Sequence, residues 1–137
     1  MRIVLPLIAV TLFGLSNPAS AGKTVSLAGL VAAPAQIRNS GSEDILCQAE
    51  IAHWFATDLA SVAPQASATL DLRFDPAAGV WAVINAVGEA LPVERAWCGV
   101  KGRTYETRFM LQLDRKRPTP IRLDCHAGTK ELVCRQG

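Results

Sequence analysis

Apolar residues recur at intervals of three and four positions between residues 43 and 63. They share one side of a helical repeat of about 3.6 residues and comprise Ile45, Ala49, Ala52, Ala56, Leu59 and Ala63. Ser40 lies three residues before Glu43, which is the spacing of a capping box at a helix N-terminus. Pro64 marks the other end, because the residue before a proline avoids the helical conformation. The pattern predicts a helix that ends near Ala63 and packs through its alanine-rich side.

Most of the remaining chain has the patterns of β-strands. Apolar and charged residues alternate over 70–75, a turn follows at 75–79, and the apolar segment 80–87 completes a predicted hairpin. Segment 88–102 shows no regular pattern. Further strands are predicted at 23–31, 104–114, 121–125 and 131–135. This order predicts an α+β fold, in which one N-terminal helix packs across a curled antiparallel sheet of about five to six strands.

Residues 1–21 have the organisation of a secretory signal peptide. Arg2 gives a positive start, an apolar core follows over 3–15, and small residues at 19–21 form a cleavage site. The apolar core is too short to span a bilayer, which takes about twenty residues. We therefore expect a cleaved signal peptide and a single domain of residues 22–137. This domain would be periplasmic or secreted, with no stable membrane insertion.

The predicted exported domain contains four cysteines, Cys47, Cys98, Cys125 and Cys134. An even number of cysteines in a small exported chain is typical of disulfides, and four of them allow three pairings. We favour Cys125–Cys134, which closes a short hairpin loop, together with Cys47–Cys98, which joins distant parts of the chain. A metal site is less favoured, because the close Cys and His pairs of such sites do not occur. No metal or other cofactor is expected.

Charged residues are unevenly distributed along the exported domain. Segment 22–93 has three basic residues and seven acidic ones, whereas segment 94–137 has ten basic and five acidic. The basic part could meet an acidic partner such as a polysaccharide, a lipid headgroup or a protein. Alternatively, the two parts fold against each other and neutralise their charges, which is the interpretation that we favour. A nucleic-acid partner is not expected, because the overall charge is nearly balanced.

Five basic residues of the C-terminal part are candidates for a binding surface. Arg108 and Arg122 lie in predicted strands, and Arg115, Lys116 and Arg117 lie in a turn between strands. If Arg108 and Arg122 project from the same sheet surface, they would form an anion-binding patch. In the competing interpretation, which we favour slightly, carboxylates neutralise these cations across the strands. The carboxylates concerned are Glu106, Asp114 and Asp124.

Two tryptophans are aromatic candidates for contact with a partner. The predicted helix places Trp54 on the same side as Cys47 and Asp58, away from the alanine-rich side. A Cys47–Cys98 bridge would cover Trp54 with the segment around Trp97, and we favour this structural role over an exposed one. Trp81 belongs to an apolar segment that is typical of a central strand.

No catalytic residue can be assigned from the sequence. His53 and His126 are the only histidines, and neither has a recognisable set of catalytic partners. The nucleophile motif G-x-S-x-G does not occur. All four cysteines are better explained by disulfides than by nucleophilic catalysis.

The sequence therefore favours a small, soluble, non-catalytic protein of the bacterial envelope with a binding, inhibitory or accessory role. Its partner would be another envelope or extracellular macromolecule, for which a protein is the first expectation. A structural subunit of an envelope or secretion assembly is the main alternative. A small periplasmic hydrolase is a third and less favoured interpretation.

Overall fold

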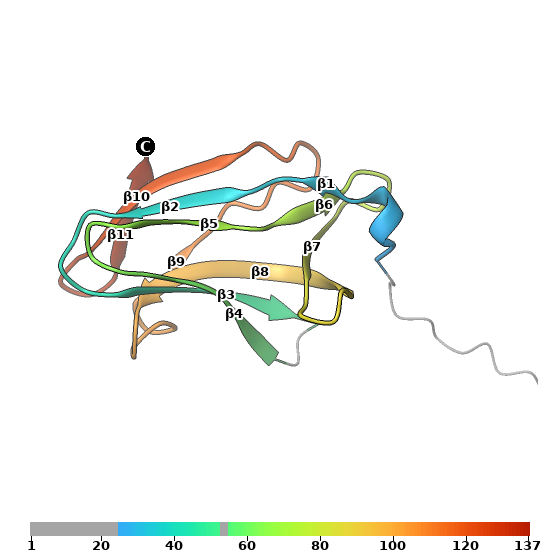
Figure 1. Cartoon of the computed structure of the whole chain (residues 1–137). Helices are drawn as coiled ribbons and strands as arrows, with labels where there is room; N and C mark the ends of the chain where they lie inside the picture. Colours follow the sequence, from blue (N-terminus) through green and yellow to red (C-terminus); the bar gives the residue numbers. More distant parts are fainter. Residues whose placement is uncertain (1–24, 53–54) are drawn as a thin grey trace, which may run out of the picture.

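The computed structural model describes residues 25–52 and 55–137, and these residues fold almost entirely into β-strands (Figure 1). Within them the chain forms one short 3-10 turn, η1 (Leu27–Gly29), and eleven strands. The strands are β1 (Val31–Ala32), β2 (Ala35–Asn39), β3 (Ile45–Ile51), β4 (Phe55–Val62), β5 (Ser67–Leu70), β6 (Arg73–Asp75), β7 (Val80–Ile84), β8 (Ala90–Val100), β9 (Phe109–Met110), β10 (Ile121–Ala127) and β11 (Leu132–Gln136). None of the helical segments in the described residues has the length and apolar character needed to cross a bilayer. The predicted signal peptide, residues 1–21, lies outside the described residues.

The strands form two sheets that pack as a sandwich. The seven-stranded sheet has the order β1-β6-β7-β8-β3-β4, with β9 paired to β8, and the four-stranded sheet has the order β11-β10-β2-β5. Figure 1 shows the four-stranded sheet above β8, β3 and β4, while β7 crosses between the two layers. Neighbouring strands are antiparallel, except that β2 and β10 are parallel. One surface of the four-stranded sheet therefore packs against the core, and its other surface faces the solvent.

The predicted helix over residues 43–63 is wrong, because this segment forms the antiparallel hairpin β3–β4. The α+β class is thereby corrected to a nearly all-β fold. In β3 every second residue is buried, as in Ile45, Cys47 and Ala49. Ile45 and Ala49 lie four residues apart, so their spacing fits a strand of period two as well as a helix. Pairing decides the outcome, because β3 bonds to β4 on one side and to β8 on the other, and such tertiary context overrides local propensity.

Segments 88–102 and 104–114 also differ from their predictions. The first, without a regular pattern, contains the long strand β8, whereas the second is mostly a tight loop followed by the two-residue strand β9. A Cβ atom added at Gly99 would lie 2.1 Å from the backbone oxygen of Thr104, so the loop folds directly onto β8. Thr107 fixes it there, because its Oγ1 accepts the N–H of Val100 at 2.8 Å and donates to the oxygen of Arg103 at 2.7 Å.

The predicted hairpins in the second half of the chain are confirmed. β6 pairs with β7 across a turn at 76–79, and β10 pairs with β11. The strand predicted at 23–31 is reduced to the 3-10 turn η1 and the short strand β1, as far as the described residues extend. The hairpins are local pairings with clear turn residues, which explains why sequence patterns identify them.

The core lies between the two sheets and includes Trp81, which was a candidate binding residue in the sequence. Trp81 is 2% exposed, and its ring packs against Phe74 with the ring centroids 5.3 Å apart. Its Nε1 donates a hydrogen bond to the backbone oxygen of Asp114 at 3.0 Å. Trp81 is therefore a core residue and does not contribute to a binding surface.

Two disulfides join neighbouring strands. Cys47–Cys98 connects β3 with β8 in the seven-stranded sheet, and Cys125–Cys134 connects β10 with β11 in the four-stranded sheet. This is the pairing that the sequence favoured. Two disulfides in a chain of this size indicate an oxidising, non-cytoplasmic location.

Candidate functional site

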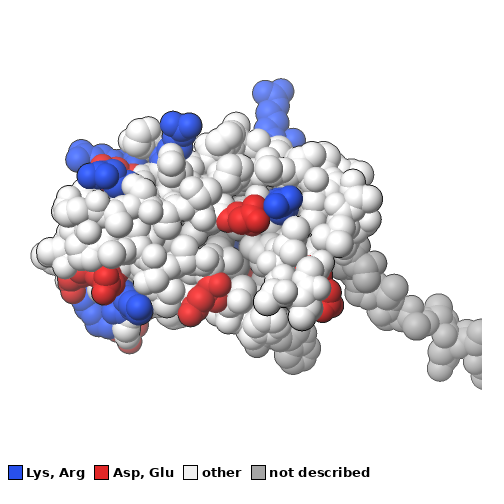
Figure 2. Space-filling view, viewed as in Figure 1, with Lys and Arg blue, Asp and Glu red and all other residues white. Residues whose placement is uncertain are grey.

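The outward-facing side chains of the four-stranded sheet form an exposed polar surface, which we call the basic face. In β2 the buried residues Ala35 and Ile37 alternate with the exposed Gln36 and Arg38, and β10 alternates in the same way. The basic face comprises Gln36, Arg38, Ser67, Thr69, Arg122, Asp124, His126, Val133 and Arg135. Figure 2 shows Lys and Arg side chains standing out along the top of the molecule, over this sheet.

The strand register sets the spacing of the arginines on the basic face. Arg135 lies opposite Asp124, and Asp124 lies opposite Arg38, while Arg122 is two residues before Asp124 on β10. Neighbouring strands are about 4.8 Å apart, and alternate residues of one strand are about 6.7 Å apart. The Cα atoms of Arg38 and Arg135 are thus about 10 Å apart, and each lies about 8 Å from that of Arg122.

Within the described residues, Asp124 is the single acidic side chain among the three arginines of this face. It makes no ion pair within the described part of the chain. The other two carboxylates that were expected to neutralise the cations lie elsewhere. Glu106 belongs to the loop that follows β8 of the other sheet, and Asp114 belongs to the loop before β10. The basic face therefore keeps an excess of positive charge.

The basic loop 115–117 is separated from β10 by residues 118–120, and its three residues are exposed. The carboxylate of Asp114 shapes this loop, because Oδ1 accepts the backbone N–H of Lys116 at 2.7 Å and that of Arg117 at 3.2 Å. These hydrogen bonds, that of Lys116 first, hold the pKa of Asp114 below its usual range. The loop adds exposed cations at the end of the sheet where β10 begins.

Arg108 does not share a surface with Arg122 in the way that the sequence allowed. It precedes β9 of the seven-stranded sheet, and its guanidinium lies 4.0 Å from the ring centroid of Tyr105. It also donates to the backbone oxygen of Tyr105 at 2.8 Å. The Tyr105 ring in turn packs edge-on against Trp97, with the centroids 5.9 Å apart. Arg108 belongs to an aromatic cluster, and the Arg108–Arg122 patch, which was the less favoured interpretation of the sequence, is not formed.

Of the two histidines and Trp54, which were also considered in the sequence, only His126 lies within the described residues. His126 is exposed on the basic face beside Val133, while His53 and Trp54 lie outside the described residues. Sequence reasoning missed Gln36, Arg38 and Thr69, because only the pairing of β2 with β10 on one side and with β5 on the other brings them into one surface with Arg122. The alternation over 35–39 was the signal that could have identified β2 as a half-exposed strand.

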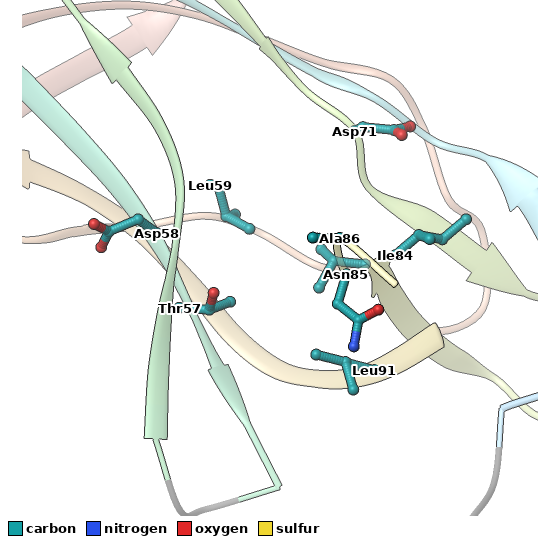
Figure 3. Close-up of a pocket in the computed structure, with 9 residues that line it drawn as sticks. Thr57, Asp58, Leu59, Asp71, Ile84, Asn85, Ala86 and Leu91 are labelled. Atoms are coloured by element: carbon teal, nitrogen blue, oxygen red, sulfur yellow. The ribbon is translucent and has the colours of Figure 1, made fainter. Parts of the chain in front are cut away.

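A second candidate site is a cleft of about 270 Å³ in the side of the sandwich (Figure 3). It is lined by Thr57, Asp58, Leu59, Asp71, Val83, Ile84, Asn85, Ala86 and Leu91. Figure 3 shows Thr57 and Leu59 pointing from β4 toward Asn85 and Leu91, whereas Asp58 points to the other side of the strand. The cleft is therefore lined by polar and apolar side chains together.

The two carboxylates at this side cleft already have partners. Asp58 accepts a hydrogen bond from Nε2 of Gln48 at 2.7 Å, and Asp71 pairs with Arg73 at 3.0 Å between Oδ1 and Nε. Within the described residues, no group of three or more His, Cys, Asp or Glu side chains is arranged to hold a metal ion. The chemistry that the described residues offer most directly is anion binding by the arginines of the basic face.

No protein family model matches the chain, and no curated protein matches it in a sequence comparison.

Proposed function

We propose that this protein is a non-catalytic binding module that recognises an anionic macromolecule through the basic face. The observation that supports the proposal is the exposure of Arg38, Arg122 and Arg135 on one sheet surface around a single acidic side chain, that of Asp124. Guanidinium groups form strong charge-assisted hydrogen bonds with carboxylates, sulfates and phosphates. A surface with three of them favours a polyanion over a neutral partner.

The proposed module works as a rigid platform. The three arginines project from hydrogen-bonded strands, and the disulfide Cys125–Cys134 joins two of these strands directly. A surface that is ordered before binding loses little conformational entropy when the partner arrives. This rigidity suits recognition of a repeating or extended partner better than it suits a catalytic cycle with moving loops.

The proposed location is the bacterial periplasm or the extracellular medium. The predicted signal peptide would direct export, and the two disulfides suit an oxidising compartment. In such a location the partner would be another component of the envelope or of the surroundings. A binding, inhibitory or accessory role is compatible with this arrangement.

Capture experiments with the purified protein and isolated envelope fractions test this proposal. We expect retention at low salt and release at high salt, because exposed charge pairs are screened by ions. The variant Arg38→Gln/Arg122→Gln/Arg135→Gln should lose retention. Its matched control is Lys101→Gln/Arg103→Gln/Arg108→Gln, which removes the same charge from the loop beside β8 and should be retained. Equal behaviour of the two variants would contradict the proposal.

A structural subunit that assembles by strand addition is a second candidate function, and strand β4 favours it. β4 is an end strand of the seven-stranded sheet and has eight residues, whereas the other end strands have two, four and five. Its one charged residue is Asp58, and Phe55 is 52% exposed. Long, apolar edge strands readily pair with another chain.

The strand-addition alternative predicts self-association or co-assembly that depends on β4. Sedimentation velocity should then show assemblies of the wild-type protein, and Phe55→Lys should abolish them, because a lysine on an edge strand opposes pairing. Val133→Lys, on the edge strand β11, is the matched control. A wild-type protein that remains monomeric at all accessible concentrations would argue against self-assembly through β4.

A further inference from the structure

A small hollow opens at one end of the basic face, beside Arg122. It has a volume of about 180 Å³ and is lined by Pro34, Gln36, Thr69, Pro120, Ile121 and Arg122. The hollow lies where β2 and β10 begin, next to the loop that carries residues 115–117. We call it the Arg122 hollow.

Strand register aligns three polar side chains along this hollow. Arg122 of β10 lies opposite Gln36 of β2, and Gln36 lies opposite Thr69 of β5. The three residues form one row across adjacent strands, with neighbours about 4.8 Å apart. Within the described residues, none of their side chains makes a hydrogen bond or an ion pair. All three are exposed and free to meet a ligand.

Two prolines form the apolar side of the Arg122 hollow. Pro34 is two residues before Gln36, and Pro120 is two residues before Arg122, so both proline rings share the outer side of the sheet. Neither proline can donate a backbone hydrogen bond. The hollow thus combines a cation, an amide and a hydroxyl with an adjacent apolar surface.

This combination fits a charged sugar better than it fits an acidic side chain or a lipid headgroup. Arg122 would hold the carboxylate or sulfate of the sugar. Gln36 and Thr69 can both donate to and accept from hydroxyl groups, and they lie about 4.8 Å apart on adjacent strands, which is similar to the width of one sugar ring. The proline rings would contact the apolar C–H surface of the ring. A glutamate side chain or a phosphate has only acceptor oxygens, so it would leave the acceptor oxygens of Gln36 and Thr69 unused and would offer no ring to the prolines.

We infer that the Arg122 hollow binds one acidic sugar unit and that the basic face binds an acidic polysaccharide. This inference rests on the proposed function and specifies the class of its ligand. Arg38 and Arg135, each about 8 Å from Arg122, would meet the charges of neighbouring units. The volume of the hollow, about 180 Å³, suits one ring, and the remaining units would lie along the open surface.

Titration calorimetry with three probes tests the inference: a hexamer of galacturonic acid, the corresponding neutral galactose hexamer, and a hexamer of glutamate. We expect the galacturonate hexamer to bind at least about tenfold more tightly than either of the others. Gln36→Ala and Thr69→Ala should each weaken galacturonate binding by about three- to tenfold and weaken glutamate binding less, because sugar hydroxyls use these side chains both as donors and as acceptors. Arg122→Gln should weaken binding of both acidic hexamers by about tenfold or more. Arg103→Gln, an equal charge change elsewhere, should alter neither.

Some outcomes would overturn the inference alone, and others would overturn the proposed function as well. Equal binding of the galacturonate and glutamate hexamers, or a preference for vesicles of phosphatidylglycerol, would overturn the acidic-sugar ligand but leave an anion-binding module. Insensitivity of galacturonate binding to Gln36→Ala and Thr69→Ala would do the same. Absence of binding to all of these anionic probes would overturn both. Circular dichroism and the melting temperature of each variant verify that these exposed substitutions leave the fold intact.

Discussion

The arginines on the two sheets differ in whether they have a partner within the protein. On the seven-stranded sheet, Arg95 of β8 donates from Nε to Glu50 of β3 at 2.9 Å, and Arg108 stacks on Tyr105. Glu50 also holds the pKa of Arg95 above its usual range through that hydrogen bond. On the four-stranded sheet, the three arginines of the basic face make no ion pair within the described residues.

Arg95 and Arg108 thus interact with other residues of the protein, whereas the three arginines of the basic face are available to bind a ligand. A partnered arginine must leave its partner before it can bind a ligand, although an exposed pair contributes little to stability. Three unpartnered arginines about 8–10 Å apart repel one another weakly and gain a partner only from outside. The comparison therefore points to the four-stranded sheet as the binding side of the molecule.

Removal of the disulfide Cys47–Cys98 should have the largest effect on stability. The bridge spans 51 residues, and its loss should lower the free energy of unfolding by about 4 kcal/mol. Cys125–Cys134 spans 9 residues, and its loss should cost only about 2.5 kcal/mol. Urea unfolding of the two double Cys→Ala variants measures both values. A larger loss for the Cys125–Cys134 variant would reverse this expectation.

Substitution of Gly99 should disturb the seven-stranded sheet without touching the basic face. In Gly99→Ala the new methyl group would collide with the backbone oxygen of Thr104, which cannot move without displacing the loop from β8. We expect the free energy of unfolding to fall by about 3 kcal/mol, which is at the upper end for overpacked sites. Gly29→Ala is the control, because its methyl group would make ordinary contacts with Asp75 at 3.5 Å. Thermal unfolding of both variants shows whether only the first is destabilised.

Neutralisation of Asp124 should strengthen anion binding by the basic face. Asp124→Asn removes the one negative charge between Arg38 and Arg135, so affinity for a polyanion should rise about threefold. Asp58→Asn, on the seven-stranded sheet, makes the same charge change and should have little effect. Calorimetric titration of both variants with one anionic polymer measures the two affinities. Equal increases in affinity would indicate a general effect of net charge and not a local effect of Asp124.

Acid should loosen the basic loop 115–117 with a small effect on the rest of the molecule. The pKa of Asp114 is lowered in the folded protein, so its hydrogen bonds stabilise the fold fully above the pKa of the unfolded chain. This contribution is lost as the pH falls below about 4 and through the lower folded pKa. Amide exchange of Lys116 and Arg117 should therefore accelerate in acid, relative to β10, and Asp114→Ala should show fast exchange at all pH values. Unchanged protection in Asp114→Ala would show that the Asp114 carboxylate does not hold the loop in place.

Local patterns allowed part of the fold and of the site to be predicted. The hairpin β10–β11 and the pairing Cys125–Cys134 depend on residues close in sequence, and both agree with the structure. The same local reasoning gave a helix over 43–63, because Ile45 and Ala49 satisfy two periodicities and only the pairing with β8 distinguishes them.

The candidate site was only partly predictable for a related physical reason. Arg122 was identified from its alternation in a strand, but its neighbours on the sheet come from β2 and β5, more than fifty residues earlier. A parallel pairing over such a distance leaves no local signal in the sequence. For Arg108 the prediction itself was wrong. The residue was expected in a strand, but it lies in a loop where its guanidinium packs on the Tyr105 ring.

The most direct test of the central claim is the salt dependence of binding to one anionic polymer, measured for three proteins. These are the wild type, Arg38→Gln/Arg122→Gln/Arg135→Gln, and the control Lys101→Gln/Arg103→Gln/Arg108→Gln. Each arginine that meets the polymer releases counterions, so the basic-face variant should bind more weakly and with a shallower salt dependence. The control should match the wild type in both respects. Equal losses in the two variants would mean that total charge, and not the basic face, governs binding.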